Sequence, residues 1–383
     1  TLVPYAPLLR SVASRLVKEV FPLGGPVTGL VPPVVGAGKA AMDAGRTKYA
    51  PASGLPELRG AIARRYREDF QVSFAPEEVT VCVGGKQALA LLYQAILDRG
   101  NEVVVPVPAW PTFAEAATVA GAKPVFVRLG ERTGFRVTAR AVAAALSPRT
   151  RAVVVNSPSN PTGAVVEPDE LLKLARLARK HGFWLVYDDT YAHLVFRPGG
   201  PPALQAVKDA AGGLLVVVGT VSKTYCMTGW RVGWVMGPKA LAEAAAALNS
   251  HSVQGPATFS QVAAAEALAA SQEGVRAMAE EYRQRRDLVH AALAGIPGVR
   301  CPLPEGGFYV FPDVTRCLSR EIPDSAALAT RLLEEQAVAV VPGEGFHAPG
   351  FFRLSFASAL DDLREGCRRI AAFLGAHAGG GRR

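Results

Sequence analysis

The stretch Leu214-Leu-Val-Val-Val-Gly-Thr-Val-Ser-Lys223 indicates the fold of this chain. It is a run of apolar, mostly β-branched residues that ends in small polar residues and a lysine. Two further runs have the same form: Phe183-Trp-Leu-Val-Tyr-Asp-Asp189 ends in two acids, and Ala152-Val-Val-Val-Asn156 ends in an asparagine. Near-continuous apolar strands of this kind are typical of a parallel sheet that is covered on both faces. Ligands bind at the carboxyl ends of such strands.

The same pattern extends over about residues 40–275, where helix patterns alternate with short apolar runs. We predict strands at Val79–Val83, Glu102–Val105, Lys123–Val127, Ala152–Val155, Phe183–Tyr187, Leu214–Val218 and Val232–Met236. We predict helices at Gln87–Leu97, Thr112–Ala120, Ala139–Leu146 and Pro168–His181. The last of these has proline in its first turn and is followed by Gly182, which are the usual start and stop signals. The sequence therefore predicts an α/β fold.

From about Gln284 onward the pattern changes to that of a second, smaller α+β unit. Strand patterns occur near Gly307–Pro312 and Val338–Val341, and a helix pattern starts at Leu360. We therefore predict a large domain at 36–280 and a small C-terminal domain at 281–383. An N-terminal segment at 1–35, with a helix at Ala6–Val20, is expected to pack with the small domain.

Composition excludes several classes of protein. Hydrophobic residues make up 49% and charged residues 20% of the 383 residues. No apolar run approaches the roughly 18–20 residues that span a bilayer, so we expect no membrane partner. The N-terminus lacks the basic-then-apolar order of a signal peptide, and we expect a cytoplasmic protein.

The charged and metal-binding residue types lead to similar exclusions. The net charge is +9, but Lys and Arg are spread along helices instead of massed in one run, so we expect no nucleic-acid partner. The five cysteines occur singly, which favours reduced thiols. The six histidines have no ligand spacing, and we expect no metal site.

Residues at the ends of the predicted strands carry the chemistry. Lys223 is flanked by hydroxyl groups and followed by Arg231, so this segment can hold an aldehyde and a phosphate. Asp188 could cap a helix, or it could keep a pyridine nitrogen protonated so that the ring acts as an electron sink. Taken alone, the stretch from Asn156 to Gly163 is turn chemistry.

Taken together and in this order, these segments resemble the class I/II aminotransferases, which are enzymes of fold type I that depend on pyridoxal 5′-phosphate (PLP). In detail the chain is most similar to bacterial aspartate aminotransferases that carry the sequence GGKQAL. The resemblance covers nearly the whole chain and implies the fold of this class: a large domain with a mainly parallel seven-stranded sheet between helices, plus a smaller α+β domain. Its strongest stretches are Lys48–Arg59, Gly84–Ala88, Asn156–Gly163, Ser222–Gly233, Gly306–Phe311 and Arg353–Ala357.

The resemblance implies roles around the cofactor ring. Lys223 carries PLP as a Schiff base (the internal aldimine), is displaced by the amino acid, and then moves a proton as general acid and base. Asp188 pairs with the pyridinium nitrogen. Tyr191 and Asn160 form hydrogen bonds with the 3′-oxygen, and Trp110 stacks on the ring.

The resemblance also implies a phosphate site and a two-subunit enzyme. The backbone N–H groups of Gly85 and Lys86, at a helix N-terminus, bind the phosphate. Side chains complete this cradle: Thr220, Ser222 and Arg231. Tyr49 reaches the phosphate from a second subunit, so the working unit is expected to be a homodimer.

Substrate contacts follow in the same way. Arg353 clamps the substrate α-carboxylate, and Gly24 lends a backbone contact to the same group. Trp110 and Asn160 border the substrate as well as the cofactor. Lys86 meets the distal carboxylate, so we expect aspartate or glutamate as the amino donor and 2-oxoglutarate or oxaloacetate as the acceptor in a ping-pong reaction. Aromatic or prephenate-like substrates are the next possibility.

Two further expectations concern local features. Cis peptide bonds are implied at Val107–Pro108, beside Trp110, and at Asn160–Pro161. The chain also departs from the family. In the segment that closes over the substrate in the family, it has Gly24-Gly25-Pro26-Val27-Thr28 where Gly-Glu-Pro-Asp-Phe is common. It has Asp189-Thr190 where Glu-Ile is usual. It also has His251 in a region where the family approaches the neighbouring subunit's site.

Two other classes compete with an aminotransferase. A PLP-dependent lyase, cyclase or oxidase on the same fold would keep the same lysine, aspartate and arginine. Regulators on this fold carry a DNA-binding domain in front; because only some 20 residues precede Gly24 here, we do not expect a regulator. An acceptor-dependent formation of oxo acid separates an aminotransferase from a lyase, because a lyase needs no acceptor.

Overall fold

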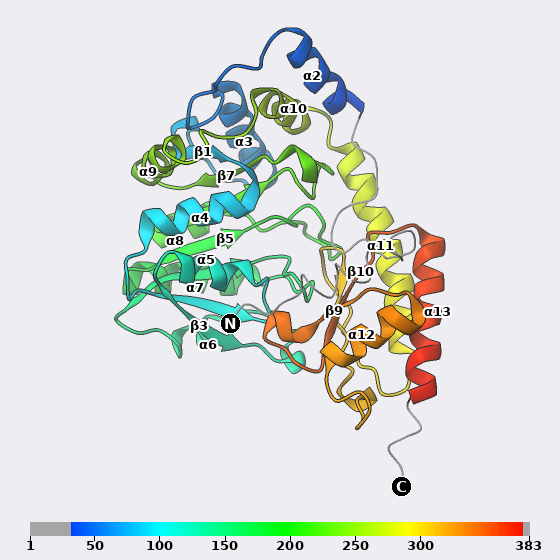
Figure 1. The fold of residues 1–383 in the computed structure, drawn as a ribbon. Coiled ribbons are helices and arrows are strands. Elements are labelled where there is room, and N and C mark those ends of the chain that lie inside the picture. The colour runs from blue at the N-terminus through cyan, green and yellow to red at the C-terminus, as the bar shows by residue number, and fades with distance from the viewer. Residues whose placement is uncertain (1–31, 378–383) are drawn as a thin grey trace.

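A computed structural model describes residues 32–377, which form two sheets surrounded by helices (Figure 1). The larger sheet has seven strands in the order β1-β7-β6-β5-β4-β2-β3. Its strands are β1 (Val79–Cys82), β2 (Glu102–Val107), β3 (Lys123–Arg128), β4 (Thr150–Asn156), β5 (Trp184–Asp188), β6 (Leu215–Thr220) and β7 (Gly233–Met236). Neighbouring strands from β3 to β6 pair in parallel, and β7 is antiparallel to both β1 and β6. All seven predicted strands and the mainly parallel sheet are confirmed.

The central strands are apolar because both of their faces are covered. Val153 and Leu185 pack in one hydrophobic cluster with residues of α3, α7 and α10, whereas Val154 and Val186 pack in another with α4 and α5. Successive side chains of a strand point to opposite faces, so these two clusters are the two sides of the sheet. The edge strand β3 is less covered: three of its residues are exposed, two are half-buried, and Val127 is its one buried residue.

The helices of the described residues alternate with the strands, as the sequence predicts. They are α2 (Pro32–Asp43), α3 (Pro56–Asp69), α4 (Gly84–Ile96), α5 (Thr112–Val119), α6 (Ala139–Ala143), α7 (Pro168–His181), α8 (Gln205–Ala211), α9 (Lys239–Ser250), α10 (Thr258–Ala269), α11 (Glu273–Ala294), α12 (Ser325–Gln336) and α13 (Leu360–His377). The bounds of α7 are those predicted. It ends because Gly182 adopts a left-handed backbone conformation with φ of 73°.

A second hydrophobic core lies beyond the first sheet. Its sheet is antiparallel with the order β8-β10-β9, formed by β8 (Tyr309–Val310), β9 (Val341–Pro342) and β10 (Phe352–Ser355). The long helix α11 extends from the side of α10 toward α13 (Figure 1). We propose that the two cores belong to a large and a small domain; the boundary predicted near residue 280 falls within α11. The helix predicted at Ala6–Val20 lies outside the described residues.

Several local expectations can be compared with the structure. The bonds Val107–Pro108 and Asn160–Pro161 are cis, as predicted, and Ser157–Pro158 is a third cis bond that we did not predict. Among residues 32–377, no helix has the length and apolar character needed to cross a membrane, and no cluster of three metal-ligating side chains occurs.

Candidate active site

A cavity of about 280 Å³ opens where three parallel strands end. Asn156, Asp188 and Thr220 are the last residues of β4, β5 and β6, and all three line this cavity. The predicted site residues that line it are Gly85, Lys86, Trp110, Asn160, Asp188, Tyr191, Thr220, Ser222, Lys223, Arg231 and Arg353. The fold therefore brings together residues that are far apart in the sequence.

Of the predicted site residues that the structure describes, Tyr49 is not part of this lining. The side chain of Tyr49 is 92% exposed in the single chain and does not border the cavity. Gly24 lies outside the described residues. His251, the departure noted above, is exposed at the end of α9 and also does not line the cavity.

Asp188 is a buried acid held by hydrogen bonds. Asn156 Nδ2 donates to Asp188 Oδ1 over 2.9 Å, and the backbone N–H of Thr190 donates to the same oxygen over 3.2 Å. Burial raises the pKa of Asp188 to about 6, although these hydrogen bonds oppose the rise. Within the described residues no Lys, Arg or His forms an ion pair with Asp188, so a cation entering the cavity would find a buried carboxylate to pair with.

Lys223 follows β6 and is largely buried. Its pKa is lowered to about 8, first by burial and then by the positive charges of Arg353 and Arg231. A substantial fraction of this amine is therefore neutral near physiological pH, which a nucleophile or a general base requires. Its Nζ lies 5.6 Å from the ring centroid of Phe308.

One end of the cavity is suited to a phosphate. The helix α4 begins at Gly84, so its first N–H groups face the cavity beside Gly85. Thr220 Oγ1 and Ser222 Oγ lie 2.7 Å apart, and the Arg231 guanidinium is adjacent. A Cβ atom on Gly84 would lie 2.5 Å from an Arg231 nitrogen, and Gly84 has φ of 75°, so a glycine is required here.

A second arginine, Arg353, is held in place at the cavity by two contacts. One guanidinium nitrogen of Arg353 donates to Asn160 Oδ1 over 2.9 Å, and the guanidinium carbon lies 4.3 Å from the ring centroid of Tyr309. The hydroxyl groups of Tyr309 and Tyr191 are 3.2 Å apart. Burial raises the pKa of Tyr191 well above its ordinary value, so its phenol stays protonated and can donate a hydrogen bond.

Five residues that line the cavity were not assigned a role from the sequence: Phe113, Asn156, Thr190, Thr228 and Tyr309. Asn156 could have been found, because it ends a strand in the same way as Asp188. Tyr309 lies in the Gly306–Phe311 stretch, but its place opposite Tyr191 depends on how the second sheet packs on the first.

These groups fit PLP. The cavity is lined by backbone N–H groups at a helix start beside an arginine, by a buried carboxyl that has no cationic partner among residues 32–377, and by a lysine with a lowered pKa. A phosphate, a pyridinium nitrogen and an aldehyde are the groups that these three features would accept. The fold and the site therefore define an enzyme of the PLP-dependent class.

Comparison of the sequence with known proteins identifies the family. The family described as "Aminotransferase class I and II" matches residues 22–370. The chain is 41% identical over 344 residues to an aspartate/prephenate aminotransferase of Cereibacter sphaeroides, covering 88% of this chain and 86% of that protein. It is 44% identical over 350 residues to an aspartate/prephenate aminotransferase of Thermus thermophilus, with the same coverage of 88% and 86%.

Solved structures agree with this result. An aspartate aminotransferase from Rhizobium meliloti superimposes with a TM-score of 0.90 at 33% identity, covering 96% of each chain. The structure of the aspartate aminotransferase of Thermus thermophilus with maleate superimposes with a TM-score of 0.87 at 40% identity, covering 95% of this chain and 96% of that chain. The chain belongs to the class I and II aminotransferases, and it is a PLP-dependent transaminase that acts on amino acids and 2-oxo acids.

Proposed function

We propose that this transaminase transfers the amino group of aspartate or glutamate to 2-oxoglutarate or oxaloacetate by a ping-pong reaction at Lys223. The observation that carries this proposal is the charge of the cavity. Among residues 32–377, four cationic side chains line it, Lys86, Lys223, Arg231 and Arg353, together with one acid, Asp188. A phosphate uses one of these cations, and a substrate with two carboxylates uses two more.

The cations are distributed so that each has a separate partner. Arg231 is adjacent to the start of α4 and would hold the phosphate of the cofactor. Arg353 is fixed by Asn160 and Tyr309 and presents a planar fork, which suits the substrate α-carboxylate. Lys86 lies over Trp110, with 5.2 Å from its Nζ to the ring centroid, and would take the distal carboxylate.

The remaining residues orient the cofactor and move the proton. PLP, when bound, supplies an aldehyde that takes the amino group and a ring that stores the electrons released at the substrate Cα. Asp188 would hold the ring nitrogen in its protonated form. Tyr191 and Asn160 would bind the 3′-oxygen, Trp110 would cover the ring, and Lys223 would take the proton from Cα because its lowered pKa leaves a neutral amine.

We further propose that the working unit is a homodimer in which Tyr49 contacts the phosphate of the neighbouring subunit. Support comes from the exposure of this tyrosine, which is 92% and is unusual for a large aromatic side chain on a single chain. Met42 of α2 and Val253, in the turn after α9, are also exposed large hydrophobic residues.

A panel of half-reactions tests the substrate assignment. Each amino acid is added singly to the holoenzyme, and the loss of cofactor absorbance and the yield of oxo acid are followed. Aspartate and glutamate are expected to react fastest. The second candidate is prephenate or an aromatic amino acid, which the aromatic lining by Trp110, Phe113 and Tyr309 favours. Formation of oxo acid in multiple turnovers without an acceptor would instead indicate a lyase or an oxidase.

A further inference from the structure

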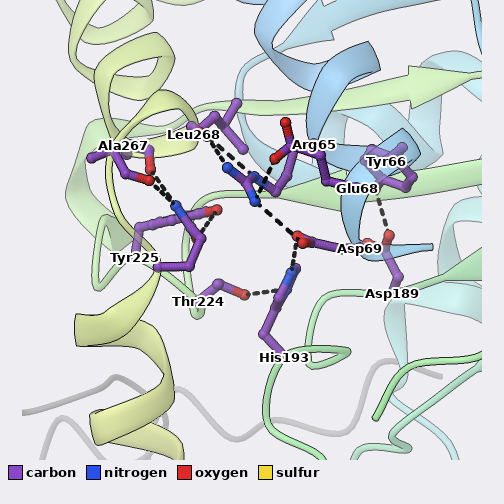
Figure 2. A network of polar contacts seen from close by, with 12 residues as sticks. Arg65, Tyr66, Glu68, Asp69, Asp189, His193, Thr224, Tyr225, Ala267 and Leu268 are labelled. Carbon is purple, nitrogen blue, oxygen red and sulfur yellow. Dashed lines mark hydrogen bonds and ion pairs between the residues drawn. The ribbon is translucent and has the colours of Figure 1, made fainter. Parts of the chain in front are cut away.

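Two adjacent acids at the end of β5 have different surroundings. Asp188 lines the cavity, whereas Asp189 does not and is 7% exposed. The hydroxyl of Tyr66, which comes from α3, donates a hydrogen bond to the carboxyl of Asp189 (Figure 2). The backbone N–H of Asp189 donates to the carbonyl of Val218 over 3.2 Å, which ties this residue to β6.

The hydroxyl of Tyr66 has a second partner. Trp234 Nε1, which can only donate, lies 3.0 Å from Tyr66 Oη, so the tyrosine oxygen accepts the indole hydrogen. Both rings are buried, at 2% and 4% exposure. The strand β6 closes this cluster tightly, because a Cβ atom on Gly219 would lie 2.4 Å from the indole nitrogen and 2.5 Å from the Tyr66 oxygen. The cluster is therefore a packed hydrogen-bonded chain from Trp234 through Tyr66 to Asp189.

The charges around Asp189 decide its ionisation. Within residues 32–377, no lysine, arginine or histidine nitrogen forms an ion pair with it. The titratable groups that face it are three phenols, Tyr66 of α3, Tyr187 of β5 and Tyr225 after β6, and the carboxyl of Asp188. An ionised Asp189 would thus be a buried charge beside a second carboxylate. By contrast, Asp188 accepts hydrogen bonds from two N–H groups and faces the cavity.

We propose that Asp188 and Asp189 carry one negative charge between them, with the proton on Asp189, so that the charge is located at Asp188. Asp189 and Tyr66 are then positioning residues: they hold β5 in place without adding a second charge behind the ring nitrogen. This inference rests on the proposed role of Asp188 toward the cofactor. Burial acts in the same direction: together with the charge of Asp188 it raises the pKa of Asp189 to about 8, although the hydrogen bond from Tyr66 opposes the rise, whereas the pKa of Asp188 is raised only to about 6.

Infrared spectroscopy of the cofactor-free protein at neutral pH tests the location of the proton. A protonated carboxyl has a C=O stretch that is distinct from the carboxylate bands. We expect this band in the wild type and in Asp188→Asn, and its loss in Asp189→Asn. A wild type without the band, or a band that is lost in Asp188→Asn and kept in Asp189→Asn, would overturn the proposal.

A second variant tests the part played by Tyr66. Tyr66→Phe keeps the ring, which stacks on Phe70 with centroids 4.9 Å apart, and removes only the hydroxyl. The carboxyl band should then move to higher frequency, because Asp189 loses a hydrogen bond; an unmoved band would contradict the assigned chain. Since no cofactor is present, these results do not depend on what Asp188 does in catalysis. If Asp188→Asn kept full transaminase activity, the role of Asp188 would fail while the location of the proton could still hold.

Discussion

The ammonium of Lys86 lies 5.2 Å from the ring centroid of Trp110, and both side chains line the cavity. The ring of Trp110 is itself fixed by an edge-to-face contact with Phe113, at 5.5 Å between centroids. A flexible lysine above an aromatic face is attracted to it only weakly where water has access. The ammonium can therefore turn toward a carboxylate or leave room for an uncharged substrate side chain.

Lys86→Ala should lower kcat/KM for aspartate roughly 10- to 150-fold, because a hydrogen bond to a charged group contributes about 1.5–3 kcal/mol. The value for phenylalanine should fall much less. Steady-state kinetics with the two donors measure this difference. Lys239→Ala is the matched control, since that lysine is 66% exposed on α9. Equal losses with both donors would mean that Lys86 serves only the cofactor.

Lys223→Ala should lose the covalent bond to PLP and lower kcat by at least about 10²-fold, since a positioned general base contributes about 10²–10⁴. Borohydride reduction followed by peptide mass mapping locates the bond. The reduced PLP adduct should lie on the peptide that contains Lys223, both in the wild type and in Lys86→Ala. A reduced adduct on another lysine would refute the assignment.

The cofactor-free enzyme should contain one lysine that titrates near pH 8, because burial and the charges of Arg353 and Arg231 lower the pKa of Lys223 to about 8. Nuclear magnetic resonance of the reductively methylated protein reports each lysine separately. Arg353→Gln removes one of the positive charges and should raise this midpoint. Arg364→Gln, 60% exposed on α13, should leave it unchanged.

Asp189 should make the stability of the protein depend on pH. Its pKa is raised in the fold from 3.8 to about 8, so its contribution to stability is fully present below about pH 4 and is lost as the pH rises to about 8. The Tm of the wild type relative to Asp189→Asn should therefore fall over this range and level off above it. Asp361→Asn, 92% exposed, should show no such trend.

Two inactive variants should restore activity when their subunits are mixed, if Tyr49 completes the neighbour's site. A dimer of one Lys223→Ala chain and one Tyr49→Ala chain has one site with both native residues. Random reassociation then gives about one native site in four. Activity that stays at the level of the separate variants, with heterodimers present by native mass spectrometry, would argue against a shared site.

Much of the fold and of the cavity could be predicted from local sequence. Asn156, Asp188 and Thr220 each end an apolar run, so their meeting at one edge follows from a parallel sheet. The direction of β7 could not be predicted, because an apolar run reads the same for either orientation. The need for glycine at position 233 was not predicted either: a Cβ atom there would lie 2.6 Å from the backbone of Gly84.

Side-chain contacts between segments that are far apart in the chain could not be predicted from the sequence. Tyr66 and Asp189 are separated by 123 positions, and Tyr66 and Trp234 by 168, with no periodicity that links them. The position of Asp189 was recognised only as a departure from the family. Tyr309 was likewise not assigned, since its contact with Arg353 depends on the pairing of β8 with β10 and its contact with Tyr191 joins segments 118 positions apart.

The excess of positive charge in the cavity has a practical consequence for handling the protein. In the part of the chain that the structure describes, four cationic side chains and one acid line the cavity, so the cofactor-free cavity should bind small inorganic anions. Phosphate or sulfate in a purification buffer will therefore occupy the start of α4 beside Arg231 and compete with the cofactor during reconstitution. Cofactor-free protein prepared in buffers without such anions should bind PLP faster. Added phosphate should inhibit this reconstitution in competition with PLP.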